Sequence, residues 1–197
     1  MSGETHREHE GKLYLRTTAV LDAWIEPWMV EWKLDIGRVK AYQTSRKSLK
    51  IGSRVDELVM NSINDKDWKL RKTDGKEVAS CMRGYQRFIE QESFKPVKTQ
   101  QTYYDADTMT CGTLDVECED AILDIKTSQQ ISAKYWLQVA WYNHLSRLNK
   151  PNLSILRVDK FWETYQYQVR PMNTAYLDIF RGILGAYRYF EQKGEVR

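Results

Sequence analysis

Apolar residues in the first half of the chain recur every three to four positions, the spacing that places them on one face of a helix. Residues 17–34 follow this period, and Pro27 predicts a break between two short helices. Longer helices are predicted from Ser45 to about Ile63 and from Lys76 to about Glu92. We expect the Ser45 helix to turn the following residues towards the core: Leu49, Val55, Leu58, Val59 and Ile63.

The period shortens after Pro96 to the alternation that is typical of strands. Strands are predicted over residues 97–104, 111–118 and 121–126, and the acidic turn Glu119–Asp120 joins the last two as a hairpin. The pattern then predicts a helix over 132–148, strands over 153–159 and 164–169, and a last helix that follows Pro171 and ends near Gln192. This order predicts an α/β fold in which helices flank a central mixed sheet.

The chain is expected to form one domain over residues 1–197, because no low-complexity tract or internal repeat marks a boundary. A chain of 197 residues can bury a hydrophobic core without disulfides or structural metals. Within this domain we expect an N-terminal helical segment over residues 1–44 and the core over residues 45–192.

Composition narrows the class of protein only slightly. The formal net charge is +3, because 30 Lys and Arg residues are offset by 27 Asp and Glu residues, and this balance alone does not indicate a nucleic-acid partner. Seven Trp and twelve Tyr residues offer flat faces on which unpaired bases could stack. Core packing is the commoner role of such rings.

The three cysteines argue against two kinds of site. Cys81, Cys111 and Cys118 are odd in number and show no C-x-x-C spacing, so neither a disulfide scaffold nor a zinc site is expected. The hydrophilic residues 1–12 lack the apolar run of a signal peptide, and no later stretch reaches the length of a membrane span. We therefore expect a cytoplasmic protein without a membrane partner.

Two carboxylates and a lysine on neighbouring predicted strands carry the most specific chemistry in the chain. The hairpin can bring Asp115 and Asp124 together, and carboxylates about 4 Å apart repel by roughly 4 kcal/mol at an effective dielectric of about 20. Such a pair requires a cation or a shared proton, and Mg²⁺ suits hard oxygen ligands. Lys126 shares a face with Asp124, because strand residues i and i+2 point the same way. The alternative is a surface salt bridge between Asp124 and Lys126.

Three short motifs in a fixed order favour a metal site over a surface salt bridge. Gly112–Asp115 reads G-T-L-D, Asp124–Thr127 reads D-I-K-T, and the next helix carries Tyr135, Gln138 and Tyr142 as Y-x-x-Q-x-x-x-Y. In this order and spacing the chain resembles the PD-(D/E)XK nuclease superfamily, specifically its RecB-like and phage-type exonuclease branch. Each motif is weak alone, and their combination is fairly specific.

The resemblance extends over nearly the whole chain. Residues 17–21, Trp32 and residues 52–57 look like the N-terminal segment and first motif helix of that branch. The predicted strands after residue 152 and the last helix look like its C-terminal part. The resemblance implies a restriction-endonuclease-like αβββαβ core with an N-terminal helical extension.

The resemblance also implies roles for individual residues. It implies a catalytic group of Asp115, Asp124, Lys126 and Gln138. It implies metal ligands at Asp115, Asp124, the backbone carbonyl of Ile125 and Asp56. Substrate contacts are implied, on weaker grounds, at Thr127, Lys134, Tyr135 and Tyr142. An alternative for Gln138 is an amide that is satisfied within the helix packing.

The chain departs from the pattern of that branch at two positions. Asp56 stands where the first motif helix often carries a metal-binding His, and Glu57 follows it. The alternative is that Ser53 and Asp56 form a capping box at a helix N-terminus. Gln100 stands where a Glu is common, and a neutral amide cannot replace the charge of a carboxylate ligand.

The resemblance finally implies cofactors and partners. We expect Mg²⁺ or Mn²⁺ and no iron-sulfur cluster, because no Cys follows Cys118. The expected partner is DNA, as single strands or duplex ends, in replication, recombination or repair, with hydrolysis that leaves a 5′ phosphate. No G-x-x-x-x-G-K-[ST] loop is present, so a helicase partner would be another polypeptide. A recombination partner, a homo-oligomer and a viral protein acting in its host cell are compatible with the same resemblance.

Two alternatives to a nuclease stay open. One is a DNA-binding protein that keeps the nuclease fold but cleaves weakly or not at all, which Asp56 and Gln100 would permit. The other is a module for a small molecule or a protein partner, in which the acidic residues are merely structural.

Overall fold

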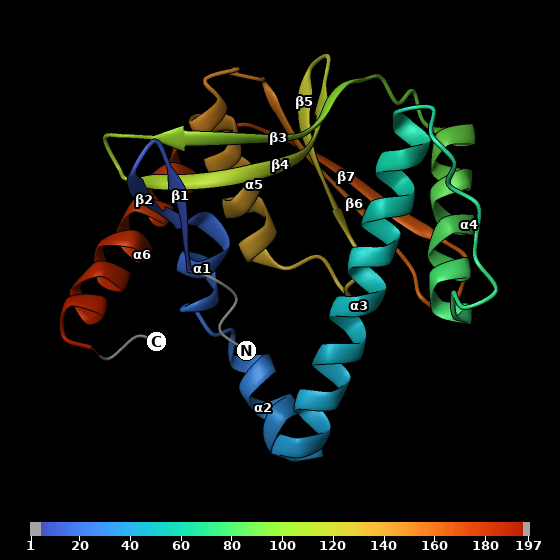
Figure 1. Cartoon of the computed structure of the whole chain (residues 1–197), viewed down its shortest axis with the longest axis horizontal. Helices are drawn as coiled ribbons and strands as arrows, with labels where there is room; N and C mark the ends of the chain where they lie inside the picture. Colours follow the sequence, from blue (N-terminus) through green and yellow to red (C-terminus); the bar gives the residue numbers. More distant parts are fainter. Residues whose placement is uncertain (1–4, 195–197) are drawn as a thin grey trace.

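A mixed seven-stranded sheet forms the centre of the computed structural model, which describes residues 5–194 (Figure 1). Residues 1–4 and 195–197, at the ends of the predicted domain, lie outside the described residues. The strands are β1 (His6–His9), β2 (Lys12–Arg16), β3 (Pro96–Asp105), β4 (Thr110–Cys118), β5 (Ala121–Lys126), β6 (Asn152–Val158) and β7 (Tyr165–Pro171). The helices are α1 (Thr17–Asp22), α2 (Pro27–Ile36), α3 (Arg38–Ile63), α4 (Lys76–Gln91), α5 (Ala133–Ser146) and α6 (Thr174–Gln192).

Strand β4 organises the sheet because it pairs on both edges. One edge pairs with β3 from residue 110 to residue 118. The other edge pairs with β2 only at residues 110–111 and with β5 only at residues 116–117. Beyond β5 the sheet continues with β6 in parallel and β7 antiparallel. Residues 112–115 therefore face the space between β2 and β5, without a paired strand on that edge among the described residues.

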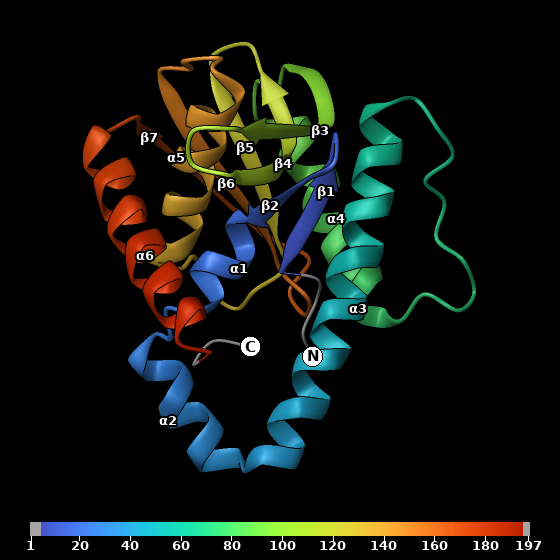
Figure 2. The same ribbon diagram turned by 60° about the vertical axis from the view of Figure 1, so that its left-hand side comes forward.

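Helices cover both faces of the sheet (Figures 1 and 2). On one face α1, α5 and α6 enclose an apolar cluster that includes Val20, Trp141 and Phe180. On the other face α3 and α4 enclose a second cluster that includes Leu58 and Phe88. The sheet is thus buried on both sides, which explains the continuous apolar run Ala121–Leu123 in β5.

Helix α2 and the first turns of α3 extend away from the sheet as an arm (Figures 1 and 2). Pro27 begins α2, as expected of a residue that lacks a backbone donor at a helix start. Gly37 joins the two helices with φ of 79°, a left-handed conformation that suits glycine. No residue of α2 is buried, so its apolar side chains lie at least partly on the surface.

The structure confirms the predicted α/β fold with a central mixed sheet and corrects several elements. The hairpin of β1 and β2 is not among the predicted elements, and α3 begins at Arg38 rather than Ser45. Since α3 continues without interruption past residues 53–56, the predicted capping box of Ser53 and Asp56 is wrong. Leu49 is 56% exposed, so its predicted place in the core is also wrong. None of the described helices is long and apolar enough to cross a membrane.

Candidate active site

Asp124 and Lys126 form an ion pair at the end of β5, on the face that α5 covers. Asp124 is 1% exposed, and its Oδ1 accepts a hydrogen bond of 2.9 Å from Nζ of Lys126. Its Oδ2 lies 2.7 Å from the same nitrogen but accepts no hydrogen bond with adequate geometry from any described residue. The predicted pair on one strand face is present, but it is buried rather than a surface salt bridge.

Asp115 reaches β5 across the unpaired stretch of β4. Its Oδ2 accepts a hydrogen bond of 2.9 Å from the backbone N–H of Ile125, the residue between Asp124 and Lys126. This bond takes the place of a ladder bond where the pairing of β4 with β5 has ended. The two predicted carboxylates and the lysine therefore lie at one edge of the sheet.

The charges at this edge shift one another's protonation equilibria. Burial raises the pKa of Asp124, Lys126 opposes that rise, and Asp115 adds to it. Burial alone would lower the pKa of Lys126, but the charges of Asp124 and Asp115 outweigh burial and raise it above its usual range. The ammonium of Lys126 thus lies close to Asp115 and Asp124, and ionising both carboxylates together costs free energy.

Gln138 and Tyr142 of α5 cap this edge from the side of the helix. The Gln138 amide donates to Oδ1 of Asp124 at 3.2 Å and to the Tyr142 hydroxyl at 3.0 Å. Burial raises the pKa of Tyr142, so its hydroxyl stays protonated at neutral pH. The amide of buried Gln138 thus bonds one partner on its own helix and one carboxylate of β5.

Asp56 of α3 approaches the same edge from the opposite side. Its Oδ2 accepts a hydrogen bond of 3.3 Å from the side chain of Gln100. Burial raises the pKa of Asp56 to about 6, the charge of Asp115 adds to the rise, and Lys126 counteracts it. Gln100 itself has φ of 50°, a left-handed conformation that is uncommon for a strand residue. The neutral amide of Gln100 is therefore a hydrogen-bond donor that holds Asp56.

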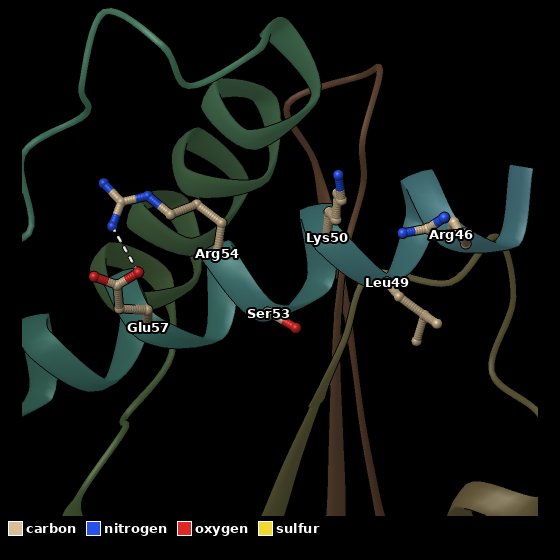
Figure 3. Close-up of a pocket in the computed structure, with 6 residues that line it drawn as sticks. All are labelled: Arg46, Leu49, Lys50, Ser53, Arg54 and Glu57. Atoms are coloured by element: carbon tan, nitrogen blue, oxygen red, sulfur yellow. Dashed lines mark ion pairs between the residues drawn. The ribbon is translucent and has the colours of Figure 1, made fainter. Parts of the chain in front are cut away.

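Glu57 points away from this edge, along the other side of α3 (Figure 3). Its carboxylate lies 2.9 Å from Nη1 of Arg54 and 3.4 Å from Nη2 of Arg71. A surface pocket here is lined by Arg46, Leu49, Lys50, Ser53, Arg54 and Glu57. Glu57 is thus an ion-pair partner on the surface of α3.

The other residues predicted to contact the substrate lie in different surroundings. The ring of Tyr135 lies 5.0 Å from Nζ of Lys126 in cation–π geometry. Thr127 packs against α3, where a Cβ added at Gly52 would come within 3.3 Å of its hydroxyl oxygen. Lys134 interacts instead with the charges of Asp22 and Glu26. Lys134 therefore belongs to the α1–α2 side of the site.

A cavity of about 190 Å³ adjoins Asp115, and the sequence patterns indicated few of the groups that line it. The cavity is lined by Arg7, Arg16, Thr17, Thr18, Cys111, Gly112, Thr113, Asp115, Gln138 and Tyr142. Arg7 is held by hydrogen bonds to the hydroxyls of Thr102 and Thr113, at 3.0 and 3.1 Å. Only the N-terminal hairpin brings Arg7 and Arg16 here, so no local sequence pattern could have indicated them.

The described side chains suit a divalent metal in part. Among residues 5–194 no group of three or more His, Cys, Asp or Glu side chains lies close enough to hold a metal ion by itself. Two carboxylates are nevertheless brought together, and Oδ2 of buried Asp124 has no hydrogen bond from the described residues. A donor set of few carboxylates with open positions is what Mg²⁺ prefers, because it keeps several water ligands.

Known proteins resemble this chain in structure but not detectably in sequence. Neither a protein-family model nor a curated protein sequence matches it. The alkaline exonuclease LHK-Exo from Laribacter hongkongensis matches with a TM-score of 0.51 and 10% identity, over 93% of this chain and 89% of its own. The chain shares the fold of an exonuclease. The protein named "Putative exonuclease" from Eubacterium rectale matches with a TM-score of 0.51 and 17% identity, over 76% of this chain and 69% of its own.

These similarities show that the chain shares its fold with the two exonucleases. At such identities a shared fold does not fix the chemistry, which depends on the residues of the site. The chemistry of this chain is therefore set by Asp115, Asp124, Lys126 and their neighbours.

Proposed function

We propose that the protein is a Mg²⁺- or Mn²⁺-dependent deoxyribonuclease that hydrolyses phosphodiester bonds at DNA ends or in single strands. One observation carries the proposal. Buried Asp124 is held by Lys126 and Gln138 and lies beside Asp115, at an open edge of a sheet with an exonuclease-type fold. A buried carboxylate and ammonium cost several kcal/mol each to desolvate, so their retention indicates a chemical role.

The metal would be held by Asp115, Asp124 and the backbone carbonyl of Ile125, with Asp56 as a further carboxylate. A bound Mg²⁺ or Mn²⁺ would polarise the phosphate and lower the pKa of a water molecule. The hydrogen bond from Gln100 favours the ionised form of Asp56 and fixes its direction. This gives Gln100 a positioning role, although its amide carries no charge.

Lys126 would act as a fixed cation. Because Asp124 and Asp115 raise the pKa of Lys126, the ammonium stays protonated and can donate a hydrogen bond to a phosphate oxygen or to the attacking water. It would also offset negative charge that develops on the phosphate. Gln138 restrains Asp124 through one N–H and Tyr142 through the other, which keeps the carboxylate oriented during turnover.

The cavity beside Asp115 offers a place for a phosphate of the substrate. Arg7 and Arg16 supply positive charge there, and the hydroxyls of Thr17 and Thr18 supply hydrogen-bonding groups. The Tyr135 ring lies 5.0 Å from Nζ of Lys126, and the Thr127 hydroxyl lies beside Gly52 of α3. A DNA strand that crosses the sheet edge would contact the cavity residues beside Asp115 and also the residues around Lys126.

A second candidate function is DNA binding without efficient cleavage. The absence of a three-acid cluster among the described side chains favours it, because fewer carboxylates bind a metal more weakly. In that case Lys126 would serve as the permanent counter-ion of Asp124.

Incubation of end-labelled single-stranded and duplex DNA with Mg²⁺, with Mn²⁺ and with EDTA separates the two functions. The nuclease proposal predicts metal-dependent loss of the substrate and products that carry a 5′ phosphate. Binding with no cleavage in either metal would support the second candidate and contradict the first.

A further inference from the structure

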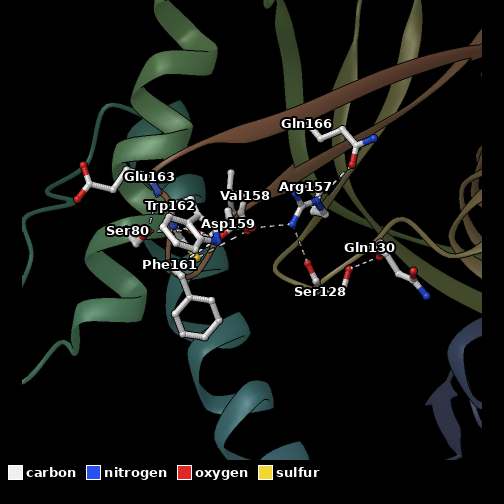
Figure 4. A network of polar contacts seen from close by, with 11 residues as sticks. Ser80, Ser128, Gln130, Arg157, Val158, Asp159, Phe161, Trp162, Glu163 and Gln166 are labelled. Atoms are coloured by element: carbon white, nitrogen blue, oxygen red, sulfur yellow. Dashed lines mark hydrogen bonds and ion pairs between the residues drawn. The ribbon is translucent and has the colours of Figure 1, made fainter. Parts of the chain in front are cut away.

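Two large aromatic rings stand exposed on the loop between β6 and β7 (Figure 4). Phe161 is 65% exposed and Trp162 is 76% exposed. Exposed Phe and Trp side chains cost free energy in water, and contiguous exposed apolar surface can mark a binding site. No role in the proposed cleavage chemistry uses either ring.

The loop that carries these rings is held in one conformation. Oδ1 of Asp159 accepts hydrogen bonds from the backbone N–H groups of Phe161 and Trp162, at 2.8 and 3.1 Å. Ser80 of α4 donates to the carbonyl oxygen of Asp159 at 3.0 Å and accepts from the N–H of Glu163 at 2.9 Å. The rings are therefore presented on a pre-organised turn, which lowers the entropy lost when they bind a partner.

The same loop begins next to the candidate active site. Arg157 of β6 is the register partner of Lys126. The Arg157 guanidinium donates to Oδ2 of Asp159 at 2.9 Å and to the carbonyl oxygen of Ser128 at 3.4 Å. Neighbouring strands are about 4.8 Å apart and each residue advances about 3.3 Å. Asp159, two residues beyond Arg157, thus has its backbone roughly 8 Å from that of Lys126.

The surface beside the loop is cationic. Residues 38–55, which form most of α3, contain six Lys and Arg residues and no Asp or Glu. Lys47 of α3 forms an ion pair with Glu77 of α4, and the charges of Lys47 and Glu77 both act on Lys160 of the loop. Arg46 and Lys50 are exposed on the same helix (Figure 3). A polyanion could bind along this side of α3, beside the loop.

We propose that the β6–β7 loop and the cationic side of α3 bind single-stranded DNA, whose bases stack on Phe161 and Trp162 while its phosphates contact Arg46, Lys47 and Lys50. This inference rests on the proposed function, because it names the form of the substrate. Duplex DNA keeps its bases stacked inside the helix, so only an unpaired strand offers base faces to exposed rings. The aromatic pair therefore selects single strands, and the cations supply affinity that depends on salt.

Binding measured in EDTA tests the proposal without cleavage. We would measure fluorescence anisotropy of a labelled oligothymidine and of a labelled duplex with the full chain. Replacement of both rings, Phe161→Ala with Trp162→Ala, is expected to weaken oligothymidine binding about tenfold or more and to leave duplex binding unchanged. Tyr189→Ala is the matched control, because Tyr189 is 58% exposed on α6.

The cationic contacts are tested by the salt dependence of the same binding. Lys50→Ala is expected to reduce the slope of log K against log salt by about 0.7 on oligothymidine, whereas the double aromatic variant should keep the slope of the wild type. Arg87→Ala, which removes an exposed cation from α4, should change neither slope nor affinity. Asp159→Ala should weaken binding through a less ordered loop while both rings are retained.

Equal oligothymidine affinity of the wild type and the double aromatic variant would overturn this proposal. A parallel cleavage assay in Mn²⁺ separates that failure from failure of the proposed function. Cleavage by the wild type with unchanged binding of the aromatic variant would leave the nuclease proposal standing and reject the loop. Loss of binding by the aromatic variant, with no cleavage by any form, would support DNA binding by the loop and contradict the nuclease proposal.

Discussion

The ring of Tyr142 in α5 lies directly against the α-carbon of Gly112 in β4. A Cβ added at Gly112 would come within 2.7 Å of Cδ1 of Tyr142 and closer still to Cε1. Only glycine therefore permits α5 to approach β4 at this point. The first and last residues of the three motifs thus form one contact, and that contact places Gln138 beside Asp124.

The contact predicts a specific effect of adding one methyl group. Gly112→Ala would push Tyr142 outwards and is expected to cost about 1–3 kcal/mol of unfolding free energy, as overpacking does. Cleavage should fall further than stability explains, because Gln138 moves with Tyr142. Denaturant unfolding and cleavage rates on the same preparations check both effects.

Gly182→Ala is the matched control for that substitution. A Cβ at Gly182 of α6 would meet nothing within 4 Å, so alanine is expected to stabilise the helix by up to about 1 kcal/mol. If the two substitutions had the same effect on stability and activity, the proposed role of the contact between Gly112 and Tyr142 would be contradicted.

Gln138 is predicted to act on cleavage through Asp124. Gln138→Ala removes a hydrogen bond from a buried carboxylate and is expected to lower the cleavage rate about 10- to 100-fold, the usual effect of losing a group that orients a metal ligand. DNA binding in EDTA should change little. Gln129→Ala, in the exposed loop after β5, should leave the rate unchanged, and an equal loss in both variants would contradict the role of Gln138.

The ion pair predicts how thermal stability responds to metal. Lys126→Ala removes the ammonium that lies 2.7 Å from Asp124, so the carboxylate is left buried without its counter-ion. We expect a lower melting temperature in EDTA and a larger rise on addition of Mn²⁺ than in the wild type. Asp124→Asn should abolish the rise. An Mn²⁺ response of Asp124→Asn as large as that of the wild type would show that the metal binds elsewhere.

A second ion pair, between α3 and the loop that follows it, predicts a dependence of stability on pH. Arg54 binds both oxygens of Asp74 at 2.9 Å each, and the two side chains are only 14% and 9% exposed. The hydrogen bond from Arg54 lowers the pKa of Asp74 below its usual value of 3.8. The pair therefore contributes stability that is complete above pH 3.8 and is lost as the pH falls towards the lower, folded pKa.

The matching experiment compares Asp74→Asn with the wild type in urea across the pH range. The variant is expected to be about 1–3 kcal/mol less stable at neutral pH, and the difference should shrink below pH 4. Asp178→Asn removes an exposed ion pair with Arg181 and should cost under about 1 kcal/mol at any pH. A difference between Asp74→Asn and the wild type that persisted in acid would exclude this ion pair as its cause.

Periodicity was sufficient to predict the elements that bury a continuous apolar face. The residues of α5 and of β4 to β6 pack into the two cores, so their apolar positions recur with the period of the element. The hairpin of β1 and β2 lacks that pattern, because Tyr14 and Leu15 are the only buried residues of these two strands. The first turns of α3 escaped prediction for the same reason, since residues 42–47 are all exposed.

The site was predictable only where its residues are close in sequence. Asp124 and Lys126 share a strand face, and Gln138 follows on the next helix, so spacing alone could bring them together. Arg7 and Arg16 reach the cavity through strand pairing with distant residues, which no local pattern contains. The bond from Gln100 to Asp56 joins residues 44 positions apart and likewise emerges only from the fold.

The most direct test of the central claim is the cleavage rate of single-stranded DNA in Mg²⁺ by the wild type and by Asp124→Asn, measured together with their DNA affinities. The wild type is expected to cleave the strand in Mg²⁺, and this cleavage is expected to stop in EDTA. Asp124→Asn is expected to bind the strand with similar affinity yet cleave it at least about 100-fold more slowly. Equal cleavage by the two proteins, or none by the wild type in either Mg²⁺ or Mn²⁺, would contradict the assignment of this sheet edge as a nuclease active site.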